Sequence, residues 1–188
     1  MAAEIVGLSF AIAPGKACYV PVAHRYAGAP EQLPRDHVLG ALRGWFADPR
    51  ARKLGQNVKY DQHALANHGI TLAGVAHDTL LESYVHEAHR PHDIDSLAWR
   101  HLDWKTIAYA DVAGKGASQI GFDQVAVDRA TEYSAEDADV TLRLHEALHP
   151  QLAADAKLGH VYEKLEMPVR EVLFRMERTG VLIDAHLL

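Results

Sequence analysis

Short apolar segments separated by turn residues predict strands in the first half of the chain. Residues 4–12 and 17–22 are rich in Ile, Val, Leu, Phe and Tyr, and the Pro14-Gly15 pair between them is a turn signal. These two segments therefore predict a hairpin. Residues 52–54 and 70–76 are further strand candidates of the same short, apolar kind.

Apolar residues spaced three and four positions apart predict helices between and after these strands. Residues 104–118 lack this spacing and predict a loop, with Gly114-Lys115-Gly116 as its most flexible point. The helix candidates are residues 34–46, 57–66, 78–85, 94–102, 122–130, 133–154 and 161–178.

The helical pattern pauses at residues 155–159, which predicts a domain boundary. We expect one domain over residues 1–157 and the start of another over residues 158–188. The second part opens with a helix in which Pro168 predicts a kink, and an extended piece follows it. The apolar stripe of this helix consists of Val161, Leu165, Val169, Val172, Leu173 and Met176.

Composition and charge narrow the class of protein. The chain is 48% hydrophobic, which suits a globular core, but it has no run of about 18 apolar residues that would span a membrane. The N-terminus lacks the pattern of a signal peptide, and Cys18 is the single cysteine, so we expect a cytoplasmic protein with Cys18 as a small buried hydrophobe. The net charge of −6 argues against binding nucleic acid through a broad basic surface, but it leaves a metal-dependent nuclease possible.

The first candidate for chemistry is the pair Tyr133 and Asp137. Residues four apart on a helix lie on one face, so the phenol and the carboxylate would point the same way. A carboxylate can hold a divalent metal ion, and a phenol beside it can orient a water molecule. The alternative is structural: Ser134 and Asp137 also fit a helix capping box, with Tyr133 at the edge of a core.

A second candidate is the stretch from Gly55 to Asp61, which opens a predicted helix. Its structural interpretation is that Asn57 caps the helix and that Asp61 is a first-turn acid near the positive end of the helix dipole. His86, His89 and His92 form a third cluster, but their neighbours are polar and no cysteine accompanies them. We expect a solvated loop there and no zinc site.

Residues 55–61 and 133–141 together resemble the second and third motifs of the 3′–5′ exonuclease domain of bacterial DNA polymerase I, the tyrosine subtype of the four-carboxylate exonuclease superfamily. The resemblance implies an α/β fold with a ribonuclease H-like mixed sheet and flanking helices. It also implies a proofreading function in DNA replication and repair. Residues 158–188 resemble the opening of the polymerase domain in the same family. Further segments that look like this family, in the expected order, are residues 6–11, 19–24, 78–84 and 114–116.

The same resemblance implies roles for individual residues. Asp61 and Asp137 match ligands of two Mg²⁺ or Mn²⁺ ions at the terminal phosphodiester, and Tyr133 matches the residue that orients the attacking water. The two carboxylates should therefore face one cleft, lined by Tyr133, within roughly 10 Å of each other. The positions that match contacts to a single-stranded 3′ end of DNA are Asn57, Tyr60 and Tyr109.

One motif of the family has no counterpart. The first motif, Asp-x-Glu, lies on a strand before residues 6–9, but the nearest acid here is Glu4, and Ala2 stands where the Asp would be. That strand is central in the family's sheet. We therefore expect a sheet without its first strand and a fragment of a longer polymerase chain with little exonuclease activity. The alternatives are a noncatalytic single-stranded nucleic-acid-binding scaffold and an RNA-processing exonuclease of the same superfamily.

Overall fold

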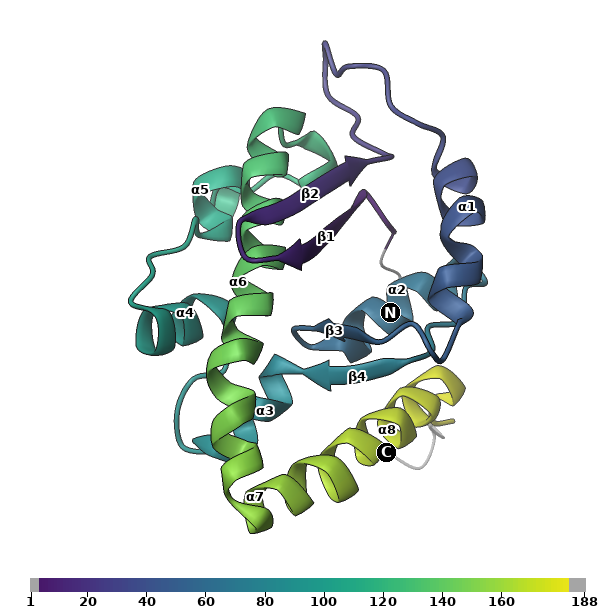
Figure 1. The fold of residues 1–188 in the computed structure, drawn as a ribbon. Helices are drawn as coiled ribbons and strands as arrows, with labels where there is room; N and C mark the ends of the chain where they lie inside the picture. The colour runs from purple at the N-terminus through teal and green to yellow at the C-terminus, as the bar shows by residue number, and fades with distance from the viewer. Residues whose placement is uncertain (1–3, 183–188) are drawn as a thin grey trace.

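A long helix forms the axis of the molecule. The computed structural model describes residues 4–182, and in it helix α6 (Val127–Ala154) contacts the hairpin at one end and α3 and α4 further along (Figure 1). Val140, Leu144 and Leu148 recur every four residues and are completely buried, so they form the stripe that packs on the neighbouring elements. The predicted helices at residues 122–130 and 133–154 are thus largely one helix, preceded by a 3₁₀ turn at Phe122–Gln124.

The N-terminal hairpin is confirmed. Strands β1 (Gly7–Ala13) and β2 (Lys16–Pro21) are antiparallel, and Gly15 closes the turn with a φ of 75°. The Gly15 N–H donates to the buried carboxylate of Asp139 at 2.6 Å, which fastens the turn to α6. The expected burial of Cys18 is wrong, because side chains alternate along β2 and Cys18 lies on the exposed face.

A second strand pair follows. Strands β3 (Lys53–Gly55) and β4 (Val75–Asp78) are parallel and are connected through α2 (Val58–Asn67). The predicted strand at residues 70–76 is wrong over most of its length. Gly74, with a φ of 70°, passes so close to the Ala51 carbonyl that an added Cβ would lie 2.6 Å from it, and the strand begins only after this bend.

The two strand pairs do not form one sheet. Within the described part of the chain, β1 pairs only with β2 and β3 only with β4, and Figure 1 shows β1 and β3 facing each other across a gap. This arrangement agrees with the expectation of a mixed sheet that lacks a central strand. Helix α1 (Arg35–Ala47) joins the two halves through a shared apolar core, which contains Ile5, Val22, Val38, Leu39, Phe46, Leu65 and Ile70.

Short helices connect β4 to α6. They are α3 (Thr79–His86), α4 (Ile94–Leu102), α5 (Tyr109–Ala113) and a 3₁₀ turn at Gly116–Ser118. The loop expected over residues 104–118 is therefore wrong at α5. That helix is too short to show a period, and the Ala108 N–H donating to the Asp111 carboxylate marks its start.

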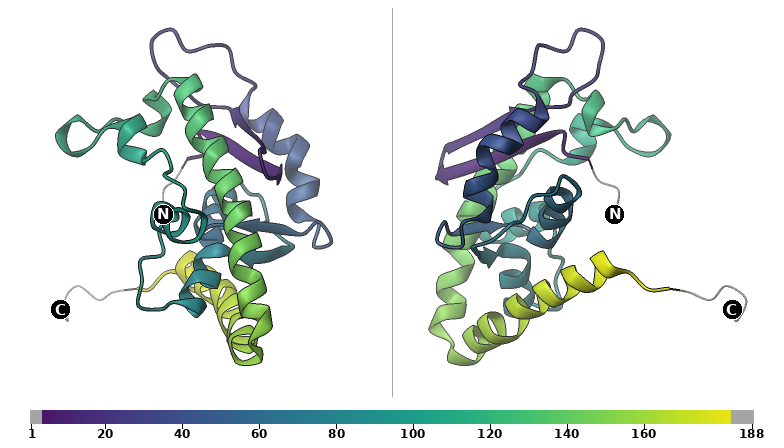
Figure 2. Two further views of the ribbon diagram at one scale, coloured as in Figure 1. Left: turned by 60° about the vertical axis from the view of Figure 1, so that its left-hand side comes forward. Right: turned by 90° about the vertical axis from the view of Figure 1, so that its right-hand side faces the viewer.

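The chain ends in helices that lean away from α6 (Figure 2). Helix α7 (Ala156–His160) leads through a π-helical turn (Val161–Glu166) into α8 (Met167–Thr179). Pro168 lies at the start of α8 directly after this turn, where its missing N–H interrupts the regular ladder. The described helices include none that is long and apolar enough to cross a membrane, and residues 183–188 of the expected tail lie outside the described part.

Candidate active site

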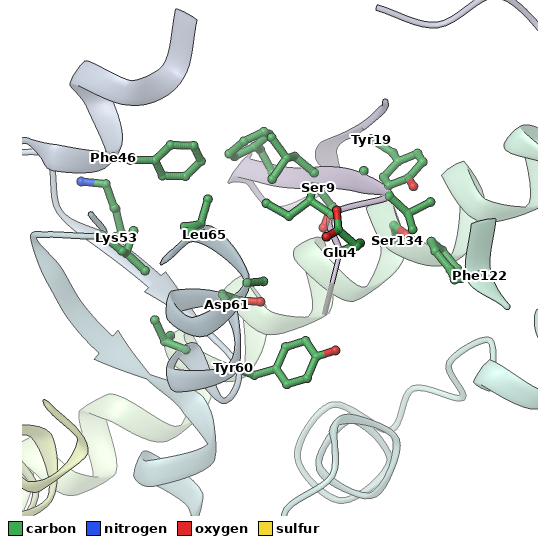
Figure 3. Close-up of a pocket in the computed structure, with 18 of the residues that line it drawn as sticks. Glu4, Ser9, Tyr19, Phe46, Lys53, Tyr60, Asp61, Leu65, Phe122 and Ser134 are labelled. Atoms are coloured by element: carbon green, nitrogen blue, oxygen red, sulfur yellow. The ribbon is translucent and has the colours of Figure 1, made fainter. Parts of the chain in front are cut away.

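A cavity of about 670 Å³ separates the hairpin from the β3–β4 pair (Figure 3). Its walls come from β1, β3, α2 and α6, and the edges of β1 and β3 that face it are unpaired among the residues described. In Figure 3, Asp61 and Tyr60 on α2 lie opposite Ser9 on β1 and Ser134 on α6. The cavity thus brings together the two stretches that carry the candidate motifs.

A carboxylate from β4 holds the start of α2. The Asp78 side chain accepts from the N–H groups of Asn57 at 3.0 Å and of Val58 at 2.9 Å, and also from Leu80 at 3.0 Å at the start of α3. Asn57 occupies the capping position with a φ of 55°, but its side chain makes no capping bond, so the expected capping role of that side chain is wrong. Asp78 takes this role because parallel strands β3 and β4 end side by side.

Asp61 reaches the cavity from the first turn of α2. The surrounding protein raises the pKa of its carboxyl group to about 7, and the nearby Asp78 carboxylate adds to this effect. The side chain is exposed to solvent through the cavity, so water screens part of the cost of charging it. An acid with this pKa is readily converted to a carboxylate when a cation lies beside it.

Tyr133 lines the same cavity from α6. Its hydroxyl donates to the carboxylate of Asp137, one turn further along the helix, and burial raises the pKa of Tyr133. Ser134 is buried inside α6, seven residues past its first residue Val127, so the capping-box interpretation of Ser134 and Asp137 is wrong.

Asp137 is the most constrained acid of the site. Burial raises the pKa of its carboxyl group to about 7; the Tyr133 hydrogen bond opposes this change, and the Asp95 and Glu136 carboxylates reinforce it. The Oδ1 atom of Asp137 is buried and has no hydrogen-bond partner within residues 4–182. Asp137 is bonded to Tyr133 but is not among the lining residues, so its expected approach to Asp61 stays a prediction.

Aromatic rings form one end of the cavity. Tyr109, Phe122 and Tyr133 pack with ring centroids 6.0 to 6.2 Å apart. The Glu136 carboxylate accepts from the Ile107 N–H at 2.6 Å, which holds the segment that leads to Tyr109. Tyr60 and Tyr109 keep 48% and 38% of their surface exposed, so both rings are accessible to a ligand.

Several members of this site were not among the residues predicted from the sequence. Phe122 and Tyr19 line the cavity, Asp95 lies near Asp137, and Glu136 positions the loop before Tyr109. Only Asp78 carried a usable signal, since an Asp at the first position of the predicted helix 78–85 suits a helix cap. The others come together through the tertiary fold.

Comparison with known proteins places the chain in a family. The model of a 3′–5′ exonuclease domain of family A DNA polymerases matches residues 1–153. DNA polymerase I of Pseudomonas aeruginosa is 53% identical over 189 residues, covering 99% of this chain and 21% of the relative. DNA polymerase I of Rhizobium leguminosarum is 42% identical over 206 residues, covering all of this chain and 20% of the relative. The chain therefore spans about a fifth of the length of these relatives.

Solved structures agree with this assignment. The POL domain of Pol1 from M. smegmatis, in complex with DNA primer-template and dNTP, superimposes with a TM-score of 0.65 at 25% identity, covering 96% of this chain and 29% of that one. Brucella melitensis NrnC superimposes with a TM-score of 0.57 at 17% identity, covering 97% and 89%, and supports the ribonuclease H-like fold. The chain belongs to the 3′–5′ exonuclease domain family of the bacterial DNA polymerases I.

Proposed function

We propose that the cavity between the hairpin and the β3–β4 pair is a proofreading site, at which the 3′-terminal phosphodiester of DNA is hydrolysed with the help of two divalent metal ions. The observation that carries the proposal is that Asp61 and Tyr133 line one cavity, and that Asp137 is bonded to Tyr133. These are the residues that match the second and third motifs of the family.

The acids of the site suit divalent cations. Asp137 has a buried oxygen without a partner among the described residues, and burial together with neighbouring carboxylates raises the pKa values of Asp61 and Asp137, so a bound cation would favour the charged form of both. Hard cations such as Mg²⁺ and Mn²⁺ prefer carboxylate oxygens. When bound, such ions supply an activated water and neutralise charge that develops at phosphorus.

The protein groups position the reactants. Asp137 accepts the hydrogen bond that holds the Tyr133 hydroxyl at the cavity wall, and from there the phenol oxygen orients a water toward phosphorus. Asp61 approaches from the opposite wall, and Asp78 keeps the start of α2 in place beneath it. Asp61 on one wall and Tyr133 on the other would then contact the phosphate from two sides. This arrangement suits an in-line displacement at phosphorus, in which the attacking and leaving oxygens lie on opposite sides.

The aromatic residues bind the nucleic acid. Tyr60 on one side and Tyr109 on the other offer exposed ring faces, on which bases of any sequence can stack, and Asn57 lies just before Tyr60. Such binding suits a proofreading site, which must accept every 3′ end. A noncatalytic single-strand-binding scaffold would use the same rings, but it would have no use for two acids whose pKa values are raised.

A strand with an Asp-x-Glu motif completes the site in this proposal. The free edges of β1 and β3 flank the cavity and can pair with such a strand from either side. The 188-residue chain carries two of the carboxylates, so we propose that it has little exonuclease activity by itself. Residues 1–157 then form the exonuclease domain of a cytoplasmic polymerase.

Residues 158–188 form the start of the polymerase domain in this proposal. Five apolar residues of the C-terminal helices are exposed, as expected if the rest of the polymerase chain covers them. Their exposed fractions are 50% for Leu165, 45% for Val169, 44% for Val172, 40% for Leu173 and 61% for Met176.

Digestion of end-labelled oligonucleotides tests the function. The chain, and a version extended by an N-terminal strand with Asp-x-Glu, are incubated with 5′-labelled single-stranded DNA or RNA in Mg²⁺ or Mn²⁺. We expect a ladder of DNA shortened from the 3′ end with the extended chain and almost none with the 188 residues alone. A preference for RNA ends would instead support an RNA-processing exonuclease, and tight DNA binding without digestion by either chain would support the scaffold.

A further inference from the structure

A second group of potential metal ligands lies near the other end of α6. His77 on β4, Glu82 on α3, and His145 and His149 on α6 present ligand atoms that all lie within 4.8 Å of one another. His145 and His149 are four residues apart and share one face of the helix. His145 is about two turns, roughly 12 Å, beyond Asp137 along α6, so this group is separate from the candidate active site.

Two of the three distances from Glu82 to the histidines match zinc coordination, and the third, to His145, is a hydrogen bond that must lengthen. The Glu82 Oε1 atom lies 2.8 Å from His145 Nδ1, 3.4 Å from His149 Nδ1 and 3.5 Å from His77 Nδ1. Zinc–nitrogen and zinc–oxygen bonds of about 2.0–2.2 Å in a tetrahedron place neighbouring ligand atoms roughly 3.3–3.5 Å apart. Small side-chain rotations would therefore place an ion between these groups.

The polar atoms of the group are incompletely satisfied without an ion. Glu82 is fully buried, and its Oε2 atom has no hydrogen-bond partner among the described residues. The Nδ1 atom of His149 is also buried without one. A buried carboxylate oxygen left unpaired is costly, and a cation bound between Glu82 and the imidazoles removes that cost.

The surrounding groups are compatible with an ion. The Tyr162 hydroxyl lies 3.4 Å from Glu82 Oε1 and can orient that carboxylate, as outer partners of metal ligands do. His77 Nε2 accepts a hydrogen bond from Arg52 at 2.9 Å. If His77 binds the ion through Nδ1, its proton lies on Nε2, which can no longer accept from Arg52. The exposed Arg52 side chain would then turn to solvent. Glu163 adds a negative charge near His149.

We propose that His77, Glu82, His145 and His149 bind one Zn²⁺ ion that stabilises the fold. Imidazole nitrogen with a single carboxylate favours zinc over Mg²⁺, which prefers oxygen ligands and water. A full set of protein ligands leaves no open position, which is typical of structural zinc sites. The ion would tie β4, α3 and α6 together and, through Tyr162, hold the π-helical turn that leads to α8.

Metal titration of chelator-treated protein tests the proposal. We expect one Zn²⁺ per chain by calorimetry, and a rise in Tm of about 5–10 °C at a Zn²⁺ concentration 100-fold above Kd. Co²⁺ should give the visible absorption of a tetrahedral complex, and Mg²⁺ at the same concentration should give no such rise in Tm. The double variant Asp61→Asn/Asp137→Asn should keep this binding, since the candidate active site takes no part in it.

Variants locate the site. Glu82→Gln and, separately, His149→Gln should each lower Zn²⁺ affinity at least tenfold, whereas the exposed His160→Gln on α7 should match the wild type. Because His149 is only partly buried, its variant tests the site even if Glu82→Gln unfolds. Circular dichroism of each variant without metal shows whether it is folded. Unchanged Zn²⁺ binding by a folded His149→Gln variant, or no one-to-one binding by the wild type, would overturn the proposal.

Discussion

Replacing Asp137 by Asn is expected to stabilise the metal-free chain at neutral and alkaline pH, although it removes a proposed metal ligand. Burial raises the pKa of this carboxyl group from 3.8 to about 7, despite the hydrogen bond from Tyr133. Between these two pKa values the folded state binds more protons at this site than the unfolded state. The free energy of unfolding therefore falls as pH rises through this window.

The size of the effect follows from the pKa change. A difference of about three pKa units is worth at most about 4 kcal/mol, of which about 2–3 kcal/mol appears between about pH 5 and about pH 8. Water that reaches the partly buried side chain reduces this figure. We expect the free energy of unfolding to fall by about 1–3 kcal/mol more in the wild type than in Asp137→Asn over that range.

Urea unfolding followed by circular dichroism at both pH values, in buffer with EDTA, measures this difference. Asn has the shape of Asp and keeps an oxygen that can accept from Tyr133, so the comparison isolates the charge. Asp103→Asn is the matched control, because Asp103 is exposed and its φ of 50° is tolerated by Asn. An identical pH dependence in the wild type and Asp137→Asn would refute the reasoning.

Three further predictions concern the rest of the cavity. Asp78→Ala leaves the N–H groups of Asn57, Val58 and Leu80 without that acceptor and should lower the free energy of unfolding by about 2–4 kcal/mol in a urea titration. The control Asp93→Ala, which removes an exposed cap of α4, should lower it by only about 1 kcal/mol. Tyr60→Ala and Tyr109→Ala should each weaken binding of single-stranded DNA about 5–100-fold in fluorescence anisotropy, and the exposed Tyr84→Ala on α3 should not. The unpaired edges of β1 and β3 should make the isolated chain unstable or self-associating in analytical ultracentrifugation; a monomer with a reversible Tm above about 65 °C would contradict this.

Sequence spacing predicts the regular elements well where a periodic pattern extends over several turns. The helix expected at residues 94–102 agrees with α4 (Ile94–Leu102), since Leu97 and Ala98 are buried and Asp93 caps it through Ser96. Short elements carry too few residues for a period, which is why α5 is missed and β4 is misplaced. Cys18 shows the same limit: which face of β2 packs inward depends on how the hairpin lies on α6.

The candidate site is predictable only in part, because its contacts join distant segments. Tyr133 and Asp137 are recognisable from their spacing, but the carboxylate that holds the start of α2 comes from Asp78, twenty residues beyond Val58. The proposed zinc ligands come from β4, α3 and α6, and only the pair His145 and His149 has a local spacing that indicates a shared face. The histidine cluster that the sequence does display, at residues 86–92, is not part of this group.

The most direct test of the proposed exonuclease site is the release of nucleoside monophosphates from single-stranded DNA by the chain extended with a strand that carries Asp-x-Glu. In Mg²⁺, Asp137→Ala should abolish this release, since the water-activating ion loses its ligand, and Tyr133→Phe should slow it but leave some. Asp103→Asn, a change at an exposed acid, should leave it unchanged. Release by Asp137→Ala at the rate of the unsubstituted extended chain would show that the site lies elsewhere.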